Sequence, residues 1–267
     1  MSGPQPLYTS SFGENHYQQK STSMIQIALN GARKESIVPK TTESIVASAV
    51  AACIKGADSI HFHPRDAEGN ETLESIFVEE QIAALRKELS RVPVGISTGE
   101  WIEPDLNTRL EQISSWKVMP DFVSVNYDEA GAEEVTELVT KKGIQIEAGL
   151  SKLEAAKSFG QLFSKGRFRR ILMEPQEQEF ALAFETVQKI ENHLNDAGVR
   201  LPILLHGFDK TCWEFIKVAF SKNYETRIGF EDVLILPDGR KAKTNAELLV
   251  QALQLKDQLA ALATNGL

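Results

Sequence analysis

The chain has 267 residues, a formal net charge of −8, 42% hydrophobic residues and two cysteines, as is usual for a globular protein. At about 150 residues per domain this length allows one domain or two, although α/β barrels of about 250 residues form a single unit. The acidic balance argues against a nucleic-acid partner, because binding to a phosphate backbone needs a clustered basic surface. Cys53 and Cys212 lie in stretches with a helical pattern, so we expect packed thiols in a reducing compartment rather than a disulfide.

The first 23 residues are polar, contain Gly and Pro, and precede an apolar run that begins at Met24. We expect residues 1–23 to form a flexible N-terminal arm. This segment lacks the basic and apolar regions of a secretory signal, and no stretch of the sequence approaches the roughly 20 apolar residues of a membrane span. The sequence therefore predicts a cytoplasmic protein without a membrane partner.

From residue 24 onward, short apolar runs alternate with longer amphipathic segments, which is the pattern of repeated βα units. The expected strands are residues 25–29, 59–63, 94–97, 122–125, 144–147, 170–173, 203–206 and 226–229. The expected helices are residues 42–55, 73–89, 104–116, 132–141, 152–164, 177–195, 210–220 and 245–262. Local sequence supports some of these boundaries, because Thr41 or Thr42 can cap the first helix and Gly143 can end the fourth.

Eight strands and eight helices favour a single (β/α)8 TIM barrel over residues 24–267. A doubly wound open sheet is the main alternative, but that fold usually has a glycine-rich dinucleotide fingerprint after its first strand. Here the first strand is followed by Asn30-Gly31-Ala32-Arg33, which does not match that fingerprint. No linker or change of composition divides the series, so we expect one catalytic domain.

Polar residues close all of the predicted strands, where the active sites of such barrels lie. Any one of them can be an ordinary loop residue that accepts a backbone hydrogen bond, but a complete ring indicates a functional site. These residues are Asn30, His61 with His63, Ser97 with Thr98, Asn126, Glu147, Glu174, His206, and Glu231 with Asp232.

The clearest motif in this ring is His61-Phe62-His63. Side chains two residues apart on a strand share one face, so both imidazoles can point into the barrel mouth. Two imidazoles suit a divalent transition metal, most often zinc, and a catalytic zinc usually has a third protein ligand and an open position. The candidates for that third ligand are His206 and the pair Glu231-Asp232. Hydrolases that resemble the amidohydrolases place such a motif on the first strand and further histidines after the fifth and sixth, which does not fit this chain.

Five sequence blocks occur in a recognisable order: Asn30-Gly31-Ala32-Arg33, His61-Phe62-His63-Pro64-Arg65-Asp66, Ile96-Ser97-Thr98-Gly99, Arg227-Ile228-Gly229-Phe230-Glu231-Asp232 and Thr244-Asn245-Ala246-Glu247. Together they resemble the β-keto acid cleavage enzymes, from Met24 to about Leu262. The resemblance implies a zinc-dependent (β/α)8 barrel. It also implies an exchange of acyl groups between a β-keto acid and acetyl-CoA that yields acetoacetate and a new acyl-CoA, and a tendency to form homo-oligomers.

The same resemblance implies roles for individual residues. His61, His63 and Glu231 become the metal ligands, and Asp232 becomes the general base, which Arg227 orients or tunes. Ser97 would donate a hydrogen bond to the substrate carboxylate. A carboxylate beside a guanidinium normally has a lowered pKa, so the base role requires burial of Asp232 or a rearrangement on binding. The other interpretation of Arg227 and Asp232 is an ordinary ion pair at a strand end.

Several strand ends depart from the family pattern. Family members that act on amino-bearing keto acids carry an acidic residue where this chain has Arg33, so we expect Arg33 to favour a neutral or anionic substrate tail. Glu129 lies near the position at which a characterised family member has a hydroxyl residue that contacts the substrate. Glu147 and Glu174 are further acidic residues that either face the site or cap the helices that follow them. The candidate substrate-binding residues are therefore Arg33, Ser97, Thr98, Asn126, Glu129, Glu147 and Glu174.

Two other functions stay open at this point. One is a zinc-dependent carbon–carbon lyase of the retro-aldol type that does not use CoA, because Glu129 and Glu174 crowd the site. The other is a non-catalytic barrel that binds a metal. The CoA site is poorly marked, and the basic residues on plausible loops are Lys34, Arg65 and Lys210.

Overall fold

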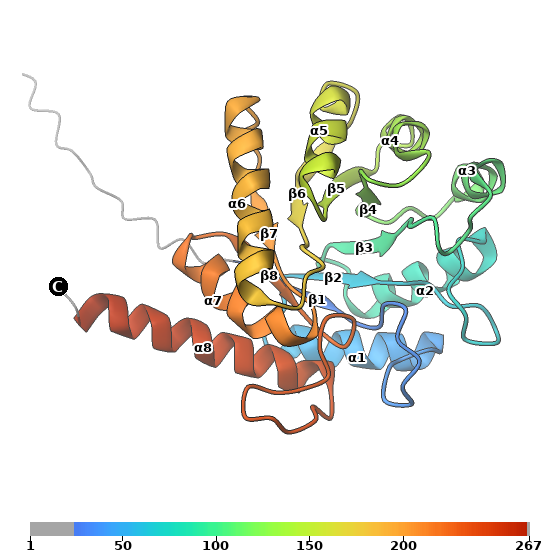
Figure 1. The fold of residues 1–267 in the computed structure, drawn as a ribbon. Coiled ribbons are helices and arrows are strands. Elements are labelled where there is room, and N and C mark those ends of the chain that lie inside the picture. The colour runs from blue at the N-terminus through green and yellow to red at the C-terminus, as the bar shows by residue number, and fades with distance from the viewer. Residues whose placement is uncertain (1–23, 266–267) are drawn as a thin grey trace, which may run out of the picture.

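The structure is a computed structural model that describes residues 24–265, in which eight parallel strands form a closed barrel with helices outside it (Figure 1). The prediction of a (β/α)8 barrel is thus confirmed, whereas the predicted N-terminal arm lies outside the described residues. The strands are β1 (Ile25–Ala28), β2 (Ser59–Phe62), β3 (Val94–Ser97), β4 (Phe122–Asn126), β5 (Gln145–Leu150), β6 (Phe168–Met173), β7 (Ile203–Leu205) and β8 (Glu225–Ile228).

Each strand is followed by an α-helix on the outside of the barrel (Figure 1). Among the described helices, none has the length and apolar character needed to cross a lipid bilayer. The helices are α1 (Thr42–Ile54), α2 (Ser75–Glu88), α3 (Leu106–Ser115), α4 (Ala132–Lys141), α5 (Leu153–Leu162), α6 (Phe180–Asp196), α7 (Cys212–Ser221), which follows the 3-10 turn η1 (Asp209–Thr211), and α8 (Asn245–Asn265).

The strands pair in chain order, and β1 closes the barrel by pairing with both β2 and β8. Gln26 of β1 is in register with Ser59 on one side and with Arg227 on the other. Because all strands are parallel, their carboxyl ends meet at one rim. Polar residues that follow strands far apart in the sequence are therefore brought together there.

Local sequence explains where some helices begin and end. The Thr41 side chain accepts a hydrogen bond from the Ser44 amide at 3.3 Å and caps α1, as predicted for Thr41 or Thr42. Gly143 has a φ of 78° just after α4, a conformation that glycine adopts without steric penalty. The apolar faces of these helices pack on the strands, and Ile45, Ala49 and Val139 are fully buried.

The prediction that the fifth strand ends at Glu147 is wrong, because β5 continues to Leu150 and Glu147 lies in its middle. The Glu147 carboxylate is fully buried, 2.6 Å from an Arg170 amino group and 3.0 Å from the Gln26 amide nitrogen. A buried carboxylate is tolerated when it is paired with a cation and hydrogen-bonded. Arg170 of β6 supplies that cation. Glu147 can therefore be buried in the middle of β5, and the strand continues past it.

We expect Glu147→Ala to lower the free energy of unfolding by about 3 kcal/mol, because it leaves a buried guanidinium with one partner fewer. Urea denaturation followed by circular dichroism measures this change. Glu133→Ala is the control, since it removes an ion pair with Lys165 that lies on the surface and should leave stability nearly unchanged. Equal stabilities of the two variants would contradict a structural role for Glu147.

Candidate metal centre and active site

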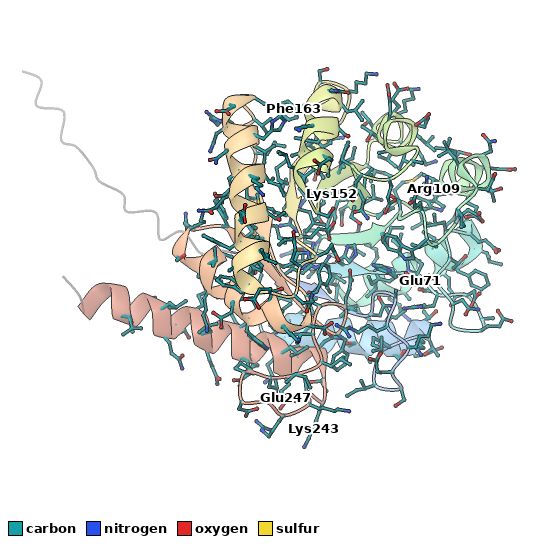
Figure 2. The ribbon with its side chains drawn as sticks, viewed as in Figure 1. Glu71, Arg109, Lys152, Phe163, Lys243 and Glu247 are labelled. Carbon is teal, nitrogen blue, oxygen red and sulfur yellow. The ribbon has the colours of Figure 1, made fainter. Side chains whose placement is uncertain are left out.

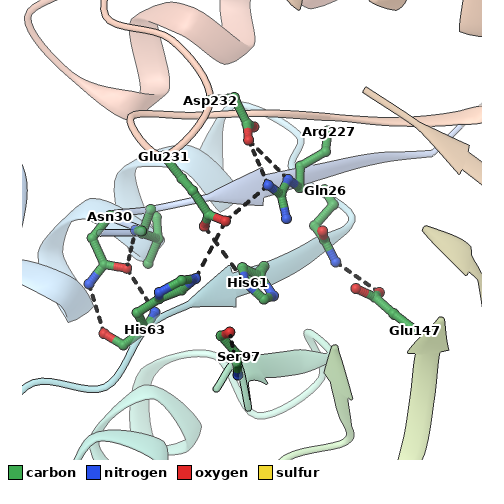
Figure 3. A network of polar contacts seen from close by, with 12 residues as sticks. Gln26, Asn30, His61, His63, Ser97, Glu147, Arg227, Glu231 and Asp232 are labelled. Atoms are coloured by element: carbon green, nitrogen blue, oxygen red, sulfur yellow. Dashed lines mark hydrogen bonds and ion pairs between the residues drawn. The ribbon is translucent and has the colours of Figure 1, made fainter. Parts of the chain in front are cut away.

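Three side chains at the rim of the barrel form a cluster that can hold a metal ion. His61 lies on β2, His63 follows β2, and Glu231 follows β8, the strand on the other side of β1 (Figure 3). The His61 Nε2 and Glu231 Oε2 atoms are 3.6 Å apart, and His63 Nε2 and Glu231 Oε1 are 3.4 Å apart. One ligand atom from each residue lies within 4.8 Å of the others. Two nitrogens and one oxygen therefore converge on one point.

The bonding state of these atoms fits a cation. Both His61 ring nitrogens and Glu231 Oε2 are buried without a hydrogen-bond partner among the described residues. Buried polar atoms without partners are costly and rare in folded proteins, unless an ion or a ligand satisfies them. Two imidazoles and a carboxylate are also the donor set of catalytic metal sites that keep one position open for water or substrate.

Glu71 and Trp101 hold His63 in place, and sequence reasoning missed both. His63 Nδ1 lies 2.5 Å from Glu71 Oε1, which also accepts a hydrogen bond from the Trp101 indole nitrogen at 3.1 Å. A carboxylate on the far ring nitrogen orients a metal-binding histidine, and here it leaves His63 Nε2 facing Glu231. The available signal was the turn after Arg65, which brings Glu71 back beside Arg65 in an antiparallel bridge.

Two asparagines and a glycine from the sequence blocks shape the backbone around the candidate metal ligands. The Asn30 Oδ1 atom accepts a hydrogen bond from the His63 amide at 2.8 Å, and its Nδ2 donates to the His63 carbonyl at 2.9 Å. On the other side of the site, Asn245 accepts a hydrogen bond from the Phe230 amide at 2.7 Å and donates one to the Leu29 carbonyl at 2.8 Å. Gly31 has a φ of 56°, and a Cβ there would lie 2.3 Å from Glu231 Cγ. Only a glycine lets the loop after β1 approach the Glu231 side chain so closely.

Burial and nearby charges set the protonation states of the three residues in this cluster. Burial lowers the pKa of His61 to about 3, so this imidazole has a free electron pair for a metal at neutral pH. Burial also acts to lower the pKa of His63, but the Glu231 and Glu71 carboxylates raise it to about 9 without a cation. Burial would raise the pKa of Glu231, but Arg227 and His63 hold it well below its usual value, so this group is a carboxylate.

Arg227 and Asp232 form a buried pair beside the cluster (Figure 3). Asp232 Oδ1 accepts hydrogen bonds from Arg227 Nε at 3.1 Å and from Nη2 at 2.7 Å, while Nη2 also donates to Glu231 at 2.9 Å. Burial raises the pKa of Asp232 above its usual value, against the opposing effect of the Arg227 guanidinium. The burial that the base role requires is therefore present.

A cavity of about 670 Å³ opens over the cluster. Lys152, which lies at the start of α5 (Figure 2), is part of its wall. The cavity brings together Arg33, Asn126, Glu129 and Glu174 from the predicted set. Gly149, near the end of β5, makes room for two of them, because a Cβ there would meet Asn126 Oδ1 at 2.3 Å and Glu174 Oε1 at 2.7 Å. The lining residues are Ala32, Arg33, His63, Glu100, Trp101, Asn126, Asp128, Glu129, Ser151, Lys152, Glu174, Gln176, Phe208 and Glu231.

Arg33 lines the cavity and also binds the backbone of the loop after β8. Its Nε donates to the Glu231 carbonyl at 3.1 Å, and Nη2 donates to the Asp232 carbonyl at 3.1 Å and to Asp209 at 2.6 Å. Opposite it, Asn126 Nδ2 donates to Glu129 at 2.6 Å. The Arg33 charge is thus partly neutralised, which reduces its effect on a substrate tail.

The remaining predicted substrate residues do not line the cavity, although Ser97 lies beside His61 and His63 (Figure 3). Glu147 lies deeper in the barrel in its pair with Arg170. The Thr98 hydroxyl donates to the Ser124 carbonyl at 2.7 Å, and the Ser97 hydroxyl accepts from the Gly99 amide at 3.3 Å while the residue stays buried. Thr98 therefore links the ends of β3 and β4. The Ser97 hydroxyl accepts this hydrogen bond through its oxygen, so its own proton is available for a hydrogen bond to a substrate.

The three basic residues considered for CoA do not line this cavity. Arg65 is buried and donates hydrogen bonds to the Gly31 and Gly69 carbonyls, so it braces the loops around the metal cluster. Lys34 is exposed, and Lys210 lines a separate groove of about 640 Å³ between α7 and α8. Lys152, which sequence reasoning did not single out, is the lysine on the wall, 3.0 Å from Asp128.

Known proteins resemble this chain in sequence and in fold. The chain is 24% identical to the 3-keto-5-aminohexanoate cleavage enzyme of Fusobacterium nucleatum over 235 residues, which cover 83% of this chain and 85% of that one. The structure of ObcA in a binary complex with oxaloacetate matches with a TM-score of 0.68 and 13% identity over 84% of this chain. The chain spans 64% of the ObcA chain in that structure.

The barrel itself is shared more widely. The N-acetylmannosamine-6-phosphate 2-epimerase of Clostridium perfringens matches with a TM-score of 0.53 and 12% identity over 95% of this chain and all of that one. At such identities the structural matches show the fold alone. The sequence model of the family described as beta-keto acid cleavage enzyme matches residues 23–264. The chain belongs to the beta-keto acid cleavage enzyme family.

Proposed function

We propose that the protein is a zinc-dependent enzyme that exchanges acyl groups between a β-keto acid and acetyl-CoA, giving acetoacetate and a new acyl-CoA. The observation that carries this proposal is the cluster of His61, His63 and Glu231 beside the buried Arg227–Asp232 pair. The family match and the cavity above the cluster support it. Zinc fits the two imidazoles and one carboxylate, although other divalent transition metals also accept this donor set.

When bound by the two histidines and Glu231, a divalent metal supplies a Lewis acid for the keto and carboxylate oxygens of the substrate. Asp232 removes a proton from the methylene group between the substrate's keto and carboxylate carbons. Arg227 orients the Asp232 carboxylate and carries the compensating positive charge. The Ser97 hydroxyl donates a hydrogen bond to the substrate carboxylate.

The carbon chemistry then needs no second base. The deprotonated methylene carbon attacks the acetyl-CoA carbonyl, and CoA leaves as a thiolate. The thiolate attacks the original keto carbon, the bond between that carbon and the former methylene carbon breaks, and acyl-CoA forms. Acetoacetate leaves as its enolate, which takes a proton from Asp232. The proton that leaves in the first step thus returns in the last, and the base is regenerated.

An assay of the zinc-loaded protein with β-keto acids, with and without acetyl-CoA, tests the proposal. We expect acetoacetate and a new acyl-CoA to appear together, and only when acetyl-CoA is present. Loss of the keto acid without acetyl-CoA would instead indicate the CoA-independent lyase, an alternative that Glu129 and Glu174 favour because both line the cavity. No turnover across the panel, with a loss of thermal stability on chelation, would indicate a non-catalytic metal-binding barrel.

The tail charge of the substrate gives a second prediction, for Arg33. We expect Arg33→Ala to lower kcat/KM for a keto acid with an anionic tail by about tenfold, which corresponds to about 1.4 kcal/mol of lost interaction. A neutral keto acid of the same length should lose much less, because it makes no ion pair with the guanidinium. Equal losses for the two substrates would show that Arg33 acts only as a brace for the Glu231–Asp232 backbone.

A further inference from the structure

His206 lies between the two carboxylates Glu174 and Asp232. Glu174 follows β6, His206 follows β7, and Asp232 lies in the loop after β8. The His206 Nε2 atom is 3.6 Å from Glu174 Oε2, and Nδ1 is 3.5 Å from Asp232 Oδ1. The ring is fully buried, and neither nitrogen has a hydrogen-bond partner among the described residues. The Phe208 ring packs edge-on against it, with centroids 4.9 Å apart.

The His206 ring can relay a proton between the two carboxylates. Burial holds the pKa of His206 well below its usual value, so the imidazole is neutral. A neutral imidazole carries one proton, with a donor at one nitrogen and an acceptor at the other. It can therefore take a proton on one side and release a different one on the other side. The two gaps exceed hydrogen-bond length by a few tenths of an ångström, which is typical of catalytic contacts that tighten when substrate binds.

The two carboxylates differ in their access to solvent. Asp232 is fully buried beside Arg227, whereas Glu174 lines the cavity. Glu174 Oε2 faces His206, so this residue joins the His206 ring to the open space of the cavity. A proton held by Asp232 thus has a continuous path of titratable groups to the cavity.

We propose that His206 and Glu174 form a proton path that connects the base Asp232 to the solvent of the cavity. A proton passes from the Asp232 carboxyl to His206 Nδ1 while the proton on Nε2 passes to the Glu174 carboxylate. His206 remains neutral and exchanges one tautomer for the other, and Glu174 then exchanges its proton with water. This path rests on the proposed function, because it takes Asp232 as the group that receives the substrate proton.

Acyl exchange and proton exchange place different demands on this path. Acyl exchange only requires Asp232 to return the proton that it took. Exchange of the substrate methylene protons with solvent requires that proton to leave Asp232 altogether. The ratio of the two rates therefore reports on the path itself, whereas a merely structural role of His206 or Glu174 would change both rates together.

The experiment uses the zinc-loaded full chain in D2O with acetoacetate, the product common to every substrate in the proposed reaction. Proton NMR measures the loss of the methylene signal above the rate without enzyme. Transfer of a ¹³C-labelled acetyl group from acetyl-CoA into acetoacetate measures acyl exchange in parallel. We expect Glu174→Gln and His206→Asn to lower the ratio of methylene exchange to acyl exchange by at least about tenfold.

Glu129→Gln is the matched control, because Glu129 lines the same cavity but is held by Asn126 and the Glu100 amide. Its ratio should stay within about twofold of the wild-type ratio, whatever happens to turnover. Wild-type ratios in both Glu174→Gln and His206→Asn would overturn the proton path and leave the proposed function intact. Neither exchange in the wild-type protein would overturn both. If the buried His206→Asn variant does not fold, Glu174→Gln alone decides, since that side chain borders the cavity.

Discussion

Replacing His61 by Ala is expected to weaken zinc binding by about 100-fold or more. Loss of a group that merely orients a metal ligand weakens binding by about 10–100-fold, and His61 would supply a ligand atom directly. The variant also removes an imidazole whose two nitrogens have no partners among the described residues. Metal content after gel filtration, and zinc titration in competition with a chelator, measure the effect. The wild-type protein should also lose thermal stability on chelation, because metal binds only the folded state.

His206→Asn is the matched control for this prediction. His206 is another fully buried histidine at a strand end, and the sequence left it open as a third ligand. The structure places it against Glu174 and Asp232, so the His206→Asn variant should keep its zinc. Retention of zinc by Glu231→Gln together with its loss from His206→Asn would show that the third ligand is His206.

Asp232→Asn is expected to lower the rate of acyl exchange by about 100-fold to 10,000-fold, the usual contribution of a general base. An asparagine keeps the size of the side chain, and its oxygen can still accept the Arg227 hydrogen bonds, but it cannot take a proton. Zinc content should be unchanged, because His61, His63 and Glu231 remain. Steady-state kinetics together with metal analysis of the same preparation measure both quantities.

Asp238→Asn makes the same chemical change elsewhere on the loop between β8 and α8. Asp238 is half-exposed and pairs with Arg240 on the surface, so turnover should stay within about twofold of wild type. Undiminished turnover of Asp232→Asn would refute the base assignment. It would leave Asp232 as the partner that neutralises the buried Arg227 guanidinium.

The sequence was sufficient for the barrel because the pattern of apolar runs and amphipathic segments repeats in each unit. The strand predicted over residues 94–97 and the helix predicted over residues 132–141 match β3 and α4, and most other ends differ by one to three residues. His61 and His63 were identifiable as a pair because side-chain alternation on a strand is fixed by backbone geometry. Glu231 required the family resemblance, since periodicity left His206 equally eligible.

The rest depends on distances across the barrel, which no local pattern contains. Glu147 is predicted to end the fifth strand at the rim, but a carboxylate is tolerated inside the barrel when it is paired with a cation, and its partner Arg170 belongs to the next strand. Glu71 and Trp101 were missed because their importance comes from contact with His63 and not from a spacing in the sequence. The ion pair that partly screens the Arg33 charge is made with Asp209, which is 176 positions away.

The loop after β1 touches the loop after β8, and this contact has a consequence for how the protein is made. Arg33 and Glu231 are 198 positions apart in the chain, yet the two loops interlock through Gly31 and Arg33. Their contact requires nearly the whole chain to be synthesised and the barrel to be closed, which is a costly, long-range step in folding. The candidate metal site has residues on both sides of this contact, so it cannot form before the barrel closes. Zinc uptake should therefore report the completion of folding, and the ion would fasten the seam between the first and last strands of the barrel.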